Sequence, residues 1–569
     1  MTVSHKEPTW NDVLCFFKTP YWYSEEDSKK FGENWRNVMI PYGIDLWEYD
    51  SVIPWADTIY YHIASGNMPK HYTPFPDEAC EAYRVWVNQG LRRCSTDPIK
   101  LRENPLPNTR PQSDDTNLGV RKDILAMTQE ELDDYRMKID DILMAGEVFH
   151  NNIRTPWQDL GYLHGDWCLH YQEAFLPWHR ANLLYVESLI GCRIPYWNWY
   201  AAESSNPDSP AAGIPQPFLD DEYVHPVTKL IRKNPLKYAC SKDGIPKLYK
   251  SIENQQKASQ YVTRYEHLTD PSSNQHEYEK CIRMFDLFHK QVDAALKQPL
   301  FSVPEGNAMP WANLPAFVPP MPDHDYRDST TVLSFDNLFE QPHDNFHGVI
   351  GHDMADNAFT AFDPIFYSLH VNIDRIFEKY INQNPSSLFT SAFCLEPFKG
   401  PQASSLAMGD PRKYLYTTIG DMAKCCEALG YRYGQPVFSD YKSNDNKDVE
   451  NRLLVQFEGV KCTDESFTID VFLVDDASVT DDNHNFSISD KNYVGRVTRL
   501  GMGEGTKNRN RCVKKGVKKF LFIDSELIKS LGRDLKIIQI VKNMKTGAII
   551  NEDEYSNWSG FKGELLYIN

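Results

Sequence analysis

The chain has 569 residues, of which 41% are hydrophobic and 24% are charged, the balance of a folded globular protein and not of a disordered one. At about 150 residues per domain, this length predicts two to four domains. The chain carries 60 Lys and Arg against 79 Asp and Glu, a formal net charge of -19. Such a charge repels nucleic-acid phosphates and anionic lipid headgroups, so we expect no nucleic-acid partner and no membrane partner.

The N-terminal sequence MTVSHKEPTWNDVLCFF lacks the apolar core of a signal peptide. No stretch approaches the roughly 20 consecutive apolar residues of a transmembrane helix. The 12 cysteines are irregularly spaced and include no C-x-x-C pair, which argues against a disulfide framework and against a thiolate zinc module. We therefore expect reduced thiols and a cytoplasmic location.

Residues 1–120 are predicted to form an N-terminal helical extension followed by a linker. The run after Pro76 includes Tyr83 and Trp86 and predicts a helix that starts near Asp77. Residues 101–120 are rich in Pro, Asn and Asp, which is typical of a linker or a surface crossing.

Residues 121–435 are predicted to form a helical domain, with amphipathic helices interrupted by Pro-rich loops. One helix begins after Thr128, the expected N-cap, and Glu131 follows three residues on as its capping-box partner. Its apolar residues at helical spacing are Leu132, Tyr135, Ile139 and Ile142. The proline-laden stretch at 309–328 is expected to be a covering loop.

A polar segment at 431–450 is predicted to be a second boundary, because the apolar pattern changes beyond it from a helical period to alternation. The alternating runs are RLLVQFEGV, SFTIDVFLVD, NYVGRVTRL, KKFLFID and KIIQIVKN. They are rich in β-branched and aromatic residues and are separated by turns. The pattern predicts an antiparallel β-sandwich over residues 450–569.

One group of histidines lies at 343–370. His343 and His347 are four residues apart, so on a helix both imidazoles project from the same face and can reach one metal ion. The pair Asp363–Pro364 predicts the start of another helix, with Asp as N-cap and Pro at the first position. His370 lies two turns into that helix. Asp374 follows on the same face, where it would orient His370 or pair with Arg375 or another cation.

A second group lies at 164–179. His170 and His179 are nine residues apart and would face opposite sides of one regular helix. Pro177 resolves this conflict if it occupies the first position of a helix that carries His179 in its first turn. His164 would then end the preceding helix, with Gly165 as the C-terminal stop.

These two trios of imidazoles on four helices suit Cu, Zn, Ni or Fe, and do not suit Mg or Ca. A di-iron carboxylate bundle binds its metals through glutamates together with Glu-x-x-His pairs, and a ligand set of six histidines with no carboxylate ligand argues against it. The other histidines are expected to be structural. Among them are His289, His324, His352 and His484.

At these residues the chain resembles the family of tyrosinases, catechol oxidases and molluscan haemocyanins, whose members hold a pair of type 3 copper ions. The resemblance covers about residues 125–430. It rests on LHG (163–165), CLHYQEAFLPWHR (168–180), PYWNW (195–199), HDNFH (343–347) and DPIFYSLHVNIDR (363–375).

The resemblance implies a mainly α fold with a β domain: a four-helix bundle around a dinuclear metal core, followed by the C-terminal β-sandwich. In this family the bundle presents three histidines to each of two copper ions. By position, the ligands of the first copper would be His164, His170 and His179. Those of the second would be His343, His347 and His370.

The resemblance also gives roles to three neighbouring residues. Cys168 stands where many members join a cysteine to the second histidine by a thioether; the alternative is a buried free thiol. Glu340 matches a glutamate that positions a water. Asp344 stands at a position that influences phenol deprotonation, and is open to a second reading as a charge at a helix start.

We therefore expect a dinuclear copper oxidase of secondary metabolism that acts with O₂ on a small aromatic substrate: a phenol, an o-diphenol or an o-aminophenol. The alternative is a haemocyanin-like, zinc-dependent enzyme of fungal secondary metabolism that catalyses a non-redox rearrangement of the cyclopenase type. A pure O₂ carrier is the third possibility. The family's double histidine reads here Leu369-His370, and His164 lies only six residues before His170, two departures that keep the zinc alternative open.

The predicted sandwich resembles the domain that shields the site in haemocyanins and latent plant oxidases. We expect it to pack over the mouth of the metal site and to limit access by large substrates. The acidic stretch 439–445 before it is expected to be an exposed linker.

Overall fold

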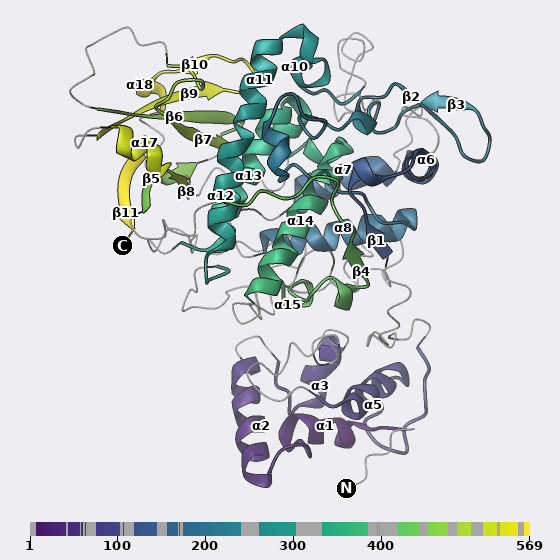
Figure 1. Cartoon of the computed structure of the whole chain (residues 1–569). Helices are drawn as coiled ribbons and strands as arrows, with labels where there is room; N and C mark the ends of the chain where they lie inside the picture. Colours follow the sequence, from purple (N-terminus) through teal and green to yellow (C-terminus); the bar gives the residue numbers. More distant parts are fainter. Residues whose placement is uncertain are drawn as a thin grey trace. The chain divides into compact units, whose positions relative to one another are not determined.

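In a computed structural model, the chain folds into two compact units (Figure 1). The first comprises residues 1–118, 307–322 and 388–430, and the second residues 119–306, 323–387 and 431–569. The structure describes residues 7–40, 44–56, 59–60, 63, 75–102, 106, 119–144, 156–168, 170, 174–240, 261–302, 333–384, 395, 398, 419–443, 452–461, 463–475, 486–501, 516–531, 535–555 and 563–568.

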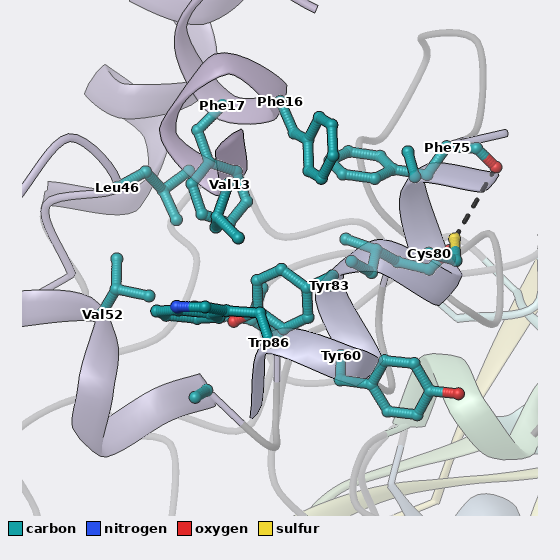
Figure 2. Packing of buried hydrophobic residues seen from close by; sticks show 14 of the residues in the cluster. Val13, Phe16, Phe17, Leu46, Val52, Tyr60, Phe75, Cys80, Tyr83 and Trp86 are labelled. Carbon is teal, nitrogen blue, oxygen red and sulfur yellow. Dashed lines mark hydrogen bonds between the residues drawn. The ribbon is translucent and has the colours of Figure 1, made fainter. Parts of the chain in front are cut away.

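The first unit is helical and has an aromatic core. Its helices are α1 (Trp10–Lys18), α2 (Glu25–Met39), α3 (Tyr49–Val52), α5 (Asp77–Asn88) and α15 (Ile419–Met422). Helix α5 begins at Asp77, as predicted, and its Tyr83 and Trp86 are fully buried. Figure 2 shows both rings packed beside Phe17 and Val13 of α1. Phe17 meets Tyr83 edge to face, with ring centroids 5.9 Å apart, an arrangement that favours aromatic pairs.

The second unit is built around four helices that are buried on nearly every side. These are α7 (Pro156–Trp167), α8 (Phe175–Ile190), α13 (Phe335–Ile350) and α14 (Ile365–Gln383). Every residue of α13 is buried, which is the pattern of a helix enclosed by others and not of a surface helix. Around these helices lie α6 (Gln129–Lys138), α10 (Glu266–Thr269), α11 (Gln275–Arg283) and α12 (Phe285–Leu296) (Figure 1).

Helix α6 confirms its predicted start but not its whole predicted face. Thr128 and Glu131 form the capping box, each side chain bonded to the backbone N–H of the other. After Lys138 the helix widens into a π-turn, Ile139–Leu143, in which Met144 N–H donates to Ile139 O at 3.1 Å. The wider turn brings Leu143 into the core and leaves Ile142 44% exposed, so Ile142 does not share the buried face of Leu132, Tyr135 and Ile139.

Short strands join the helical part of the second unit. Strand β1 (Gly119–Arg121) pairs in parallel with β4 (Tyr431–Tyr433), and β2 (Glu222–Val224) pairs antiparallel with β3 (Ile231–Lys233). The first pairing places Arg121 in the interior, where its guanidinium reaches Glu187 of α8 at 2.7 Å and Asp374 of α14 at 2.8 Å. These ion pairs hold β1, and with it the paired strand β4, against α8 and α14.

The C-terminal region is an antiparallel β-sandwich, as predicted. The four-stranded sheet has the order β10 (Ile549–Ile550), β9 (Leu535–Asn543), β6 (Phe467–Asp475) and β7 (Tyr493–Arg499); the three-stranded sheet has the order β11 (Gly563–Ile568), β5 (Arg452–Lys461) and β8 (Gly516–Phe522). Val455, Ile469, Val497 and Leu521 share the core between the sheets. Two short helices complete the region, α17 (Ser525–Ser530) and α18 (Glu552–Tyr555). The expected class, mainly α with a β domain, is confirmed.

The segment before the sandwich is exposed at Ser439 and Lys442, as predicted, but it is anchored to the bundle between them. Asp440 accepts two hydrogen bonds from the buried Arg375 of α14, at 2.8 and 2.9 Å, and also contacts Lys379. Tyr441 N–H donates to Tyr200 O at 2.9 Å. A buried guanidinium needs a carboxylate partner, and this need holds residues 439–443 against the bundle. The remaining linker residues, 444–450, lie outside the described residues, as does the proline-laden loop at 309–328.

Among the helices that the structure describes, none combines the length and the apolar composition needed to cross a bilayer. No disulfide joins the cysteines of the described ranges. The expected domain boundaries at 120, 435 and 450 stay predictions.

Candidate metal centre

The first histidine trio converges. His164 lies near the end of α7, His170 lies between the two helices, and His179 lies in the first part of α8. Their ring centroids are separated by 6.0 Å (His164 to His170), 5.4 Å (His164 to His179) and 5.2 Å (His170 to His179). The short separation of His164 and His170 in the sequence therefore does not prevent a common site.

The helix ends around this trio differ from the prediction in two details. Helix α7 continues past Gly165 to Trp167, so Gly165 is not a C-terminal stop. A Cβ at Gly165 would lie 3.0 Å from Ala358 O, so the glycine allows close packing against that backbone. Helix α8 begins at Phe175, which makes Pro177 its third residue and not its first. The first four N–H groups of a helix have no partner in the helix, so a proline is tolerated there as well.

The second trio converges as the i, i+4 spacing predicts. His343 and His347 of α13 have ring centroids 4.4 Å apart, and His370 of α14 lies 4.9 Å from the first and 5.4 Å from the second. One possible ligand atom from each ring lies within 4.8 Å of those of the other two. Asp363 accepts from Ile365 N–H at 3.0 Å and so caps α14, the helix that carries His370.

Three imidazoles are oriented by backbone carbonyl groups. His164 Nδ1 donates to Asn357 O at 3.1 Å, His179 Nδ1 donates to Phe175 O at 2.8 Å, and His347 Nδ1 donates to Met354 O at 2.9 Å. A proton on Nδ1 leaves the Nε2 lone pair free to bind a metal. The backbone thus fixes the tautomer that a ligand needs.

Two further imidazoles, one in each trio, are oriented by carboxylates. His170 Nδ1 donates to Glu340 Oε1 at 3.0 Å, and His343 Nδ1 donates to Asp344 Oδ1 at 3.0 Å. Both carboxylates belong to α13, one helical turn apart, and both are buried. Such carboxylate partners fix the ring and make it a stronger ligand.

The facing nitrogens provide a direct test of fit. His164 Nε2 and His179 Nε2 are 3.3 Å apart, and His347 Nε2 and His370 Nε2 are 3.2 Å apart. In the first pair both protons reside on Nδ1, so two lone pairs face each other, and they repel unless a cation lies between them. Two ligands at the ~2.0–2.1 Å of a metal–imidazole bond, in tetrahedral geometry, lie about 3.3 Å apart. The spacing of this pair in each trio therefore fits a shared metal ion.

Burial keeps these rings neutral. Desolvation, and after it the neighbouring imidazoles, lowers the pKa of His179, His347 and His370 well below the usual value. Desolvation also lowers the pKa of His343, although Asp344 opposes this shift. Neutral imidazole is the form that binds transition metals.

The two trios form one centre. His179 and His370 stack with their rings 4.4 Å apart and 13° from parallel, and His170 faces His343 at 5.5 Å. Phe366 of α14 contacts His164 at 4.7 Å and His370 at 4.2 Å and so forms an apolar wall beside both trios. Two metal ions bound here would be neighbours in a dry, aromatic-lined interior.

Asp344 is held at both oxygens. Its second oxygen, Oδ2, accepts from Lys519 Nζ at 2.7 Å, and both residues are almost completely buried. Burial alone would raise the pKa of Asp344, but Lys519 and then His343 outweigh this effect and hold it well below the usual range. The geometry therefore favours an anchored carboxylate over a proton acceptor.

Cys168 is buried next to the first trio, and its Sγ lies within 4.8 Å of ligand atoms of His164 and His170. The thioether to His170 stays a prediction. Of the two roles predicted for Asp374, the structure shows the pairing with a cation. Asp374 pairs with Arg180 and Arg121 and not with His370.

The sequence pattern did not point to Lys519. This lysine comes from β8, far along the chain, and the backbone carbonyls of Asn357 and Met354 were equally invisible to motif reasoning. One signal was present: in the alternating run KKFLFID, two adjacent lysines cannot both face solvent.

Two of the histidines expected to be structural have surroundings that fit this role. His289 of α12 is fully buried and its Nε2 donates to Trp199 O at 2.7 Å. His352 lies beside Tyr265, with ring centroids 4.9 Å apart. His324 and His484 lie outside the described residues. Phe346 packs against Trp199 in the core, with ring centroids 4.3 Å apart.

Comparison with known proteins places this centre in a family. A family model described as the common central domain of tyrosinase matches residues 147–383. The hemocyanin G-type, units Oda to Odg, of Enteroctopus dofleini is 22% identical over 287 residues, which cover 46% of this chain and 8% of that protein. The tyrosinase HcTyr2 of a Hahella strain is 26% identical over 284 residues, 40% of this chain and 49% of that protein. The chain thus spans half or less of the length of these relatives.

The structural likeness extends beyond the matched domain. Deoxygenated hemocyanin from Rapana thomasiana superposes with a TM-score of 0.53 at 14% identity, over 79% of this chain and 99% of that chain. At this identity the likeness shows the fold alone. The match to the common central domain of tyrosinase, residues 147–383, thus includes both histidine trios.

Proposed function

We propose that the protein is a dinuclear copper oxidase that oxidises an o-diphenol or an o-aminophenol with O₂. The domain family implies a copper pair, and the two trios, with opposed Nε2 atoms 3.2 and 3.3 Å apart, are compatible with it. Copper at these positions would carry electrons from the phenol to O₂. In the overall reaction, two diphenols and one O₂ give two quinones and two waters.

The choice of substrate rests on the hydrogen bonds that Glu340 and Asp344 already make. A monophenol must lose its proton before it is hydroxylated, and Glu340 and Asp344 are the candidate bases. Glu340 holds His170 Nδ1, and Asp344 holds His343 Nδ1 and Lys519 Nζ. Both therefore serve to orient ligands, and this favours a substrate whose second oxygen or nitrogen makes it easier to oxidise.

The chain also contributes neutral imidazoles and an interior that excludes water. Burial lowers the pKa of His179 and His370 and so favours their neutral form, and Phe366 lies against His164 and His370 as an apolar wall. Exclusion of water strengthens every electrostatic interaction in the centre and protects reactive products from hydrolysis.

The test is metal analysis of the purified full chain combined with measurement of O₂ uptake. We expect two copper ions per chain, copper-dependent O₂ uptake with catechol, and much slower uptake with tyrosine. Zinc in place of copper, with no O₂ uptake, would replace the proposal with the non-redox, zinc-dependent alternative. Reversible O₂ binding without catechol turnover would identify a carrier.

A further inference from the structure

Helix α13 carries two buried carboxylates that serve different trios. Glu340 accepts from His170 of the first trio, and Asp344 accepts from His343 of the second, each at 3.0 Å. The two rings face each other at 5.5 Å with 28° between their planes. This part of the centre therefore holds two anionic groups in a region that excludes water.

A cation from the sandwich reaches this pair. Lys519 of β8 is 2% exposed at its side chain and places Nζ 2.7 Å from Asp344 Oδ2. Glu340 also interacts electrostatically with the amine. An ion pair buried this deeply is stabilising only when its geometry is good, and loss of one partner leaves the other charge uncompensated.

The contact is part of a wider interface between α12, α13 and the sandwich. Asn345 Nδ2 donates to Arg496 O at 2.9 Å, and Gln291 Nε2 donates to Phe520 O at 3.1 Å. The first bond holds β7 against α13, and the second fixes the backbone directly after Lys519 against α12, which limits the movement of the amine away from α13.

We propose that Lys519 is a positioning residue of the metal centre: by holding Asp344 Oδ2, it keeps Oδ1 on His343 Nδ1 and aims His343 Nε2 at the second metal position. His343 Nε2 is buried and has no hydrogen-bond partner in the described part of the chain, as a ligand atom requires. Without the amine, the free carboxylate oxygen would turn toward the metal or toward water and release the ring. The inference rests on the proposed function only in that the trios bind metal ions.

The structure offers a matched pair of variants. Lys518 is the neighbouring residue of the same strand, its side chain is 6% exposed, and it pairs with Glu458 instead of α13. Lys519→Met and Lys518→Met therefore make the same chemical change, one residue apart, and only the first removes the partner of Asp344.

The measurement is the rate at which each metal-loaded protein releases its ions to a chelator, with thermal unfolding of the apo-protein as the control for folding. We expect Lys519→Met to release one of its two ions about 10–100-fold faster than the unmodified chain, the usual effect of losing an outer partner of a ligand. Lys518→Met should release both at the original rates. The double variant Asp344→Asn/Lys519→Met should recover much of the retention, because a neutral amide needs no cation and still accepts from His343.

The outcomes separate this inference from the proposed function. Equal release by the two lysine variants, or a loss confined to the unfolding temperature of the apo-protein, overturns the role of Lys519 and leaves the proposed function intact. Tight binding of zinc with the expected release pattern supports the role of Lys519 and overturns the copper oxidase. A chain that retains no ion overturns both. If Lys519→Met fails to fold, Lys519→Gln takes its place beside Lys519→Arg: faster release by Lys519→Gln than by Lys519→Arg supports the role of the cation, and equal release overturns it.

Discussion

Among the described residues, five of the six imidazoles of the centre have a hydrogen-bond partner for Nδ1, and His370 has none. Carbonyl groups hold three rings and carboxylates hold two, while His370 Nδ1 is buried without a hydrogen bond. His370 is instead held by ring contacts, to Phe366 at 4.2 Å and to His179 at 4.4 Å. Position within the fold, and not residue type, therefore separates a ligand from an ordinary buried histidine.

Removing a ligand should abolish activity and preserve the fold. We expect His343→Ala and His370→Ala each to lower kcat/KM with catechol by more than the ~10–100-fold that loss of an outer partner costs. The free energy of unfolding of the apo-protein should fall by only about 1–3 kcal/mol, as for other buried truncations. His289→Ala, a buried histidine outside the trios, is the control and should keep its metal content. Full activity in either ligand variant would exclude the second trio from the mechanism.

The position of Cys168 leads to a covalent prediction. We expect Cys168 to be joined to His170 in the copper-loaded protein, since its sulfur lies in the same cluster of possible ligand atoms. Peptide mass spectrometry should find the two peptides linked, lighter than their sum by the mass of two hydrogen atoms. Quantitative alkylation of Cys168 in fully active protein would contradict this expectation.

At the scale of elements, α13 determines the centre more than any other helix. It supplies Glu340, His343, Asp344 and His347 on successive turns, and every one of its residues is buried. The neighbouring helix α7 approaches the 357–358 backbone closely, and that backbone provides the carbonyl group that orients His164. Helix packing distances therefore set ligand geometry.

Gly165 tests this link between packing and ligand geometry. In Gly165→Ala, the new Cβ would lie 3.0 Å from Ala358 O, so the 357–358 backbone must shift and the bond from His164 Nδ1 to Asn357 O must lengthen. We expect a loss of about 1–3 kcal/mol in unfolding free energy and weaker retention of one metal ion. In Gly348→Ala of α13, the new Cβ would meet the movable side chains of Thr498 and Met544, so this control should change both quantities less. Equal effects of the two substitutions would show that packing at Gly165 does not set ligand geometry.

Helix α12 provides a pH prediction that does not involve the metal. Burial lowers the pKa of His289 to about 4, while in the unfolded chain it is near 6.5. Below pH 6.5 the unfolded chain therefore binds a proton that the folded chain does not, and the free energy of unfolding falls until about pH 4. The loss amounts to roughly 3 kcal/mol.

Chemical denaturation of the apo-protein between pH 7 and pH 4 measures this loss. His289→Gln should reduce the slope of the profile, because a neutral amide does not titrate, and substitution of the exposed His276 should change it less. An unaltered slope in His289→Gln would assign the acid sensitivity to other groups.

At the scale of the whole molecule, the sandwich contributes to the centre and does not only cover it. The sequence suggested a shield joined by an exposed linker. The structure instead places Lys519 against Asp344 and ties residues 439–443 to α14. Shielding of large substrates remains a prediction, and the polar contacts with α13 add a second role.

Separation of the sandwich distinguishes the two roles. We expect a chain cleaved at a protease site introduced within 444–450 to stay associated on gel filtration, to keep its metal and to oxidise catechol and a bulky phenol at unchanged relative rates. Release of the sandwich should then reduce turnover of both substrates, because Asp344 loses its partner. Higher turnover of the bulky phenol after release, with metal retained, would leave shielding as its only role.

The sequence by itself determined the local structure and the metal-binding residue types. Some features depend only on interactions within a few residues, and these could be predicted from the sequence. They are the capping box at Thr128, the start of α5, the strand runs and the i, i+4 pair of His343 and His347. The resemblance supplied the grouping of the six histidines. Tertiary structure alone decided the continuation of α7 past Gly165, the π-turn that exposes Ile142, the cations paired with Asp374 and the contact between Lys519 and Asp344. Each of these joins residues that are distant in the sequence, or depends on what packs against a helix, and neither spacing nor propensity records such contacts.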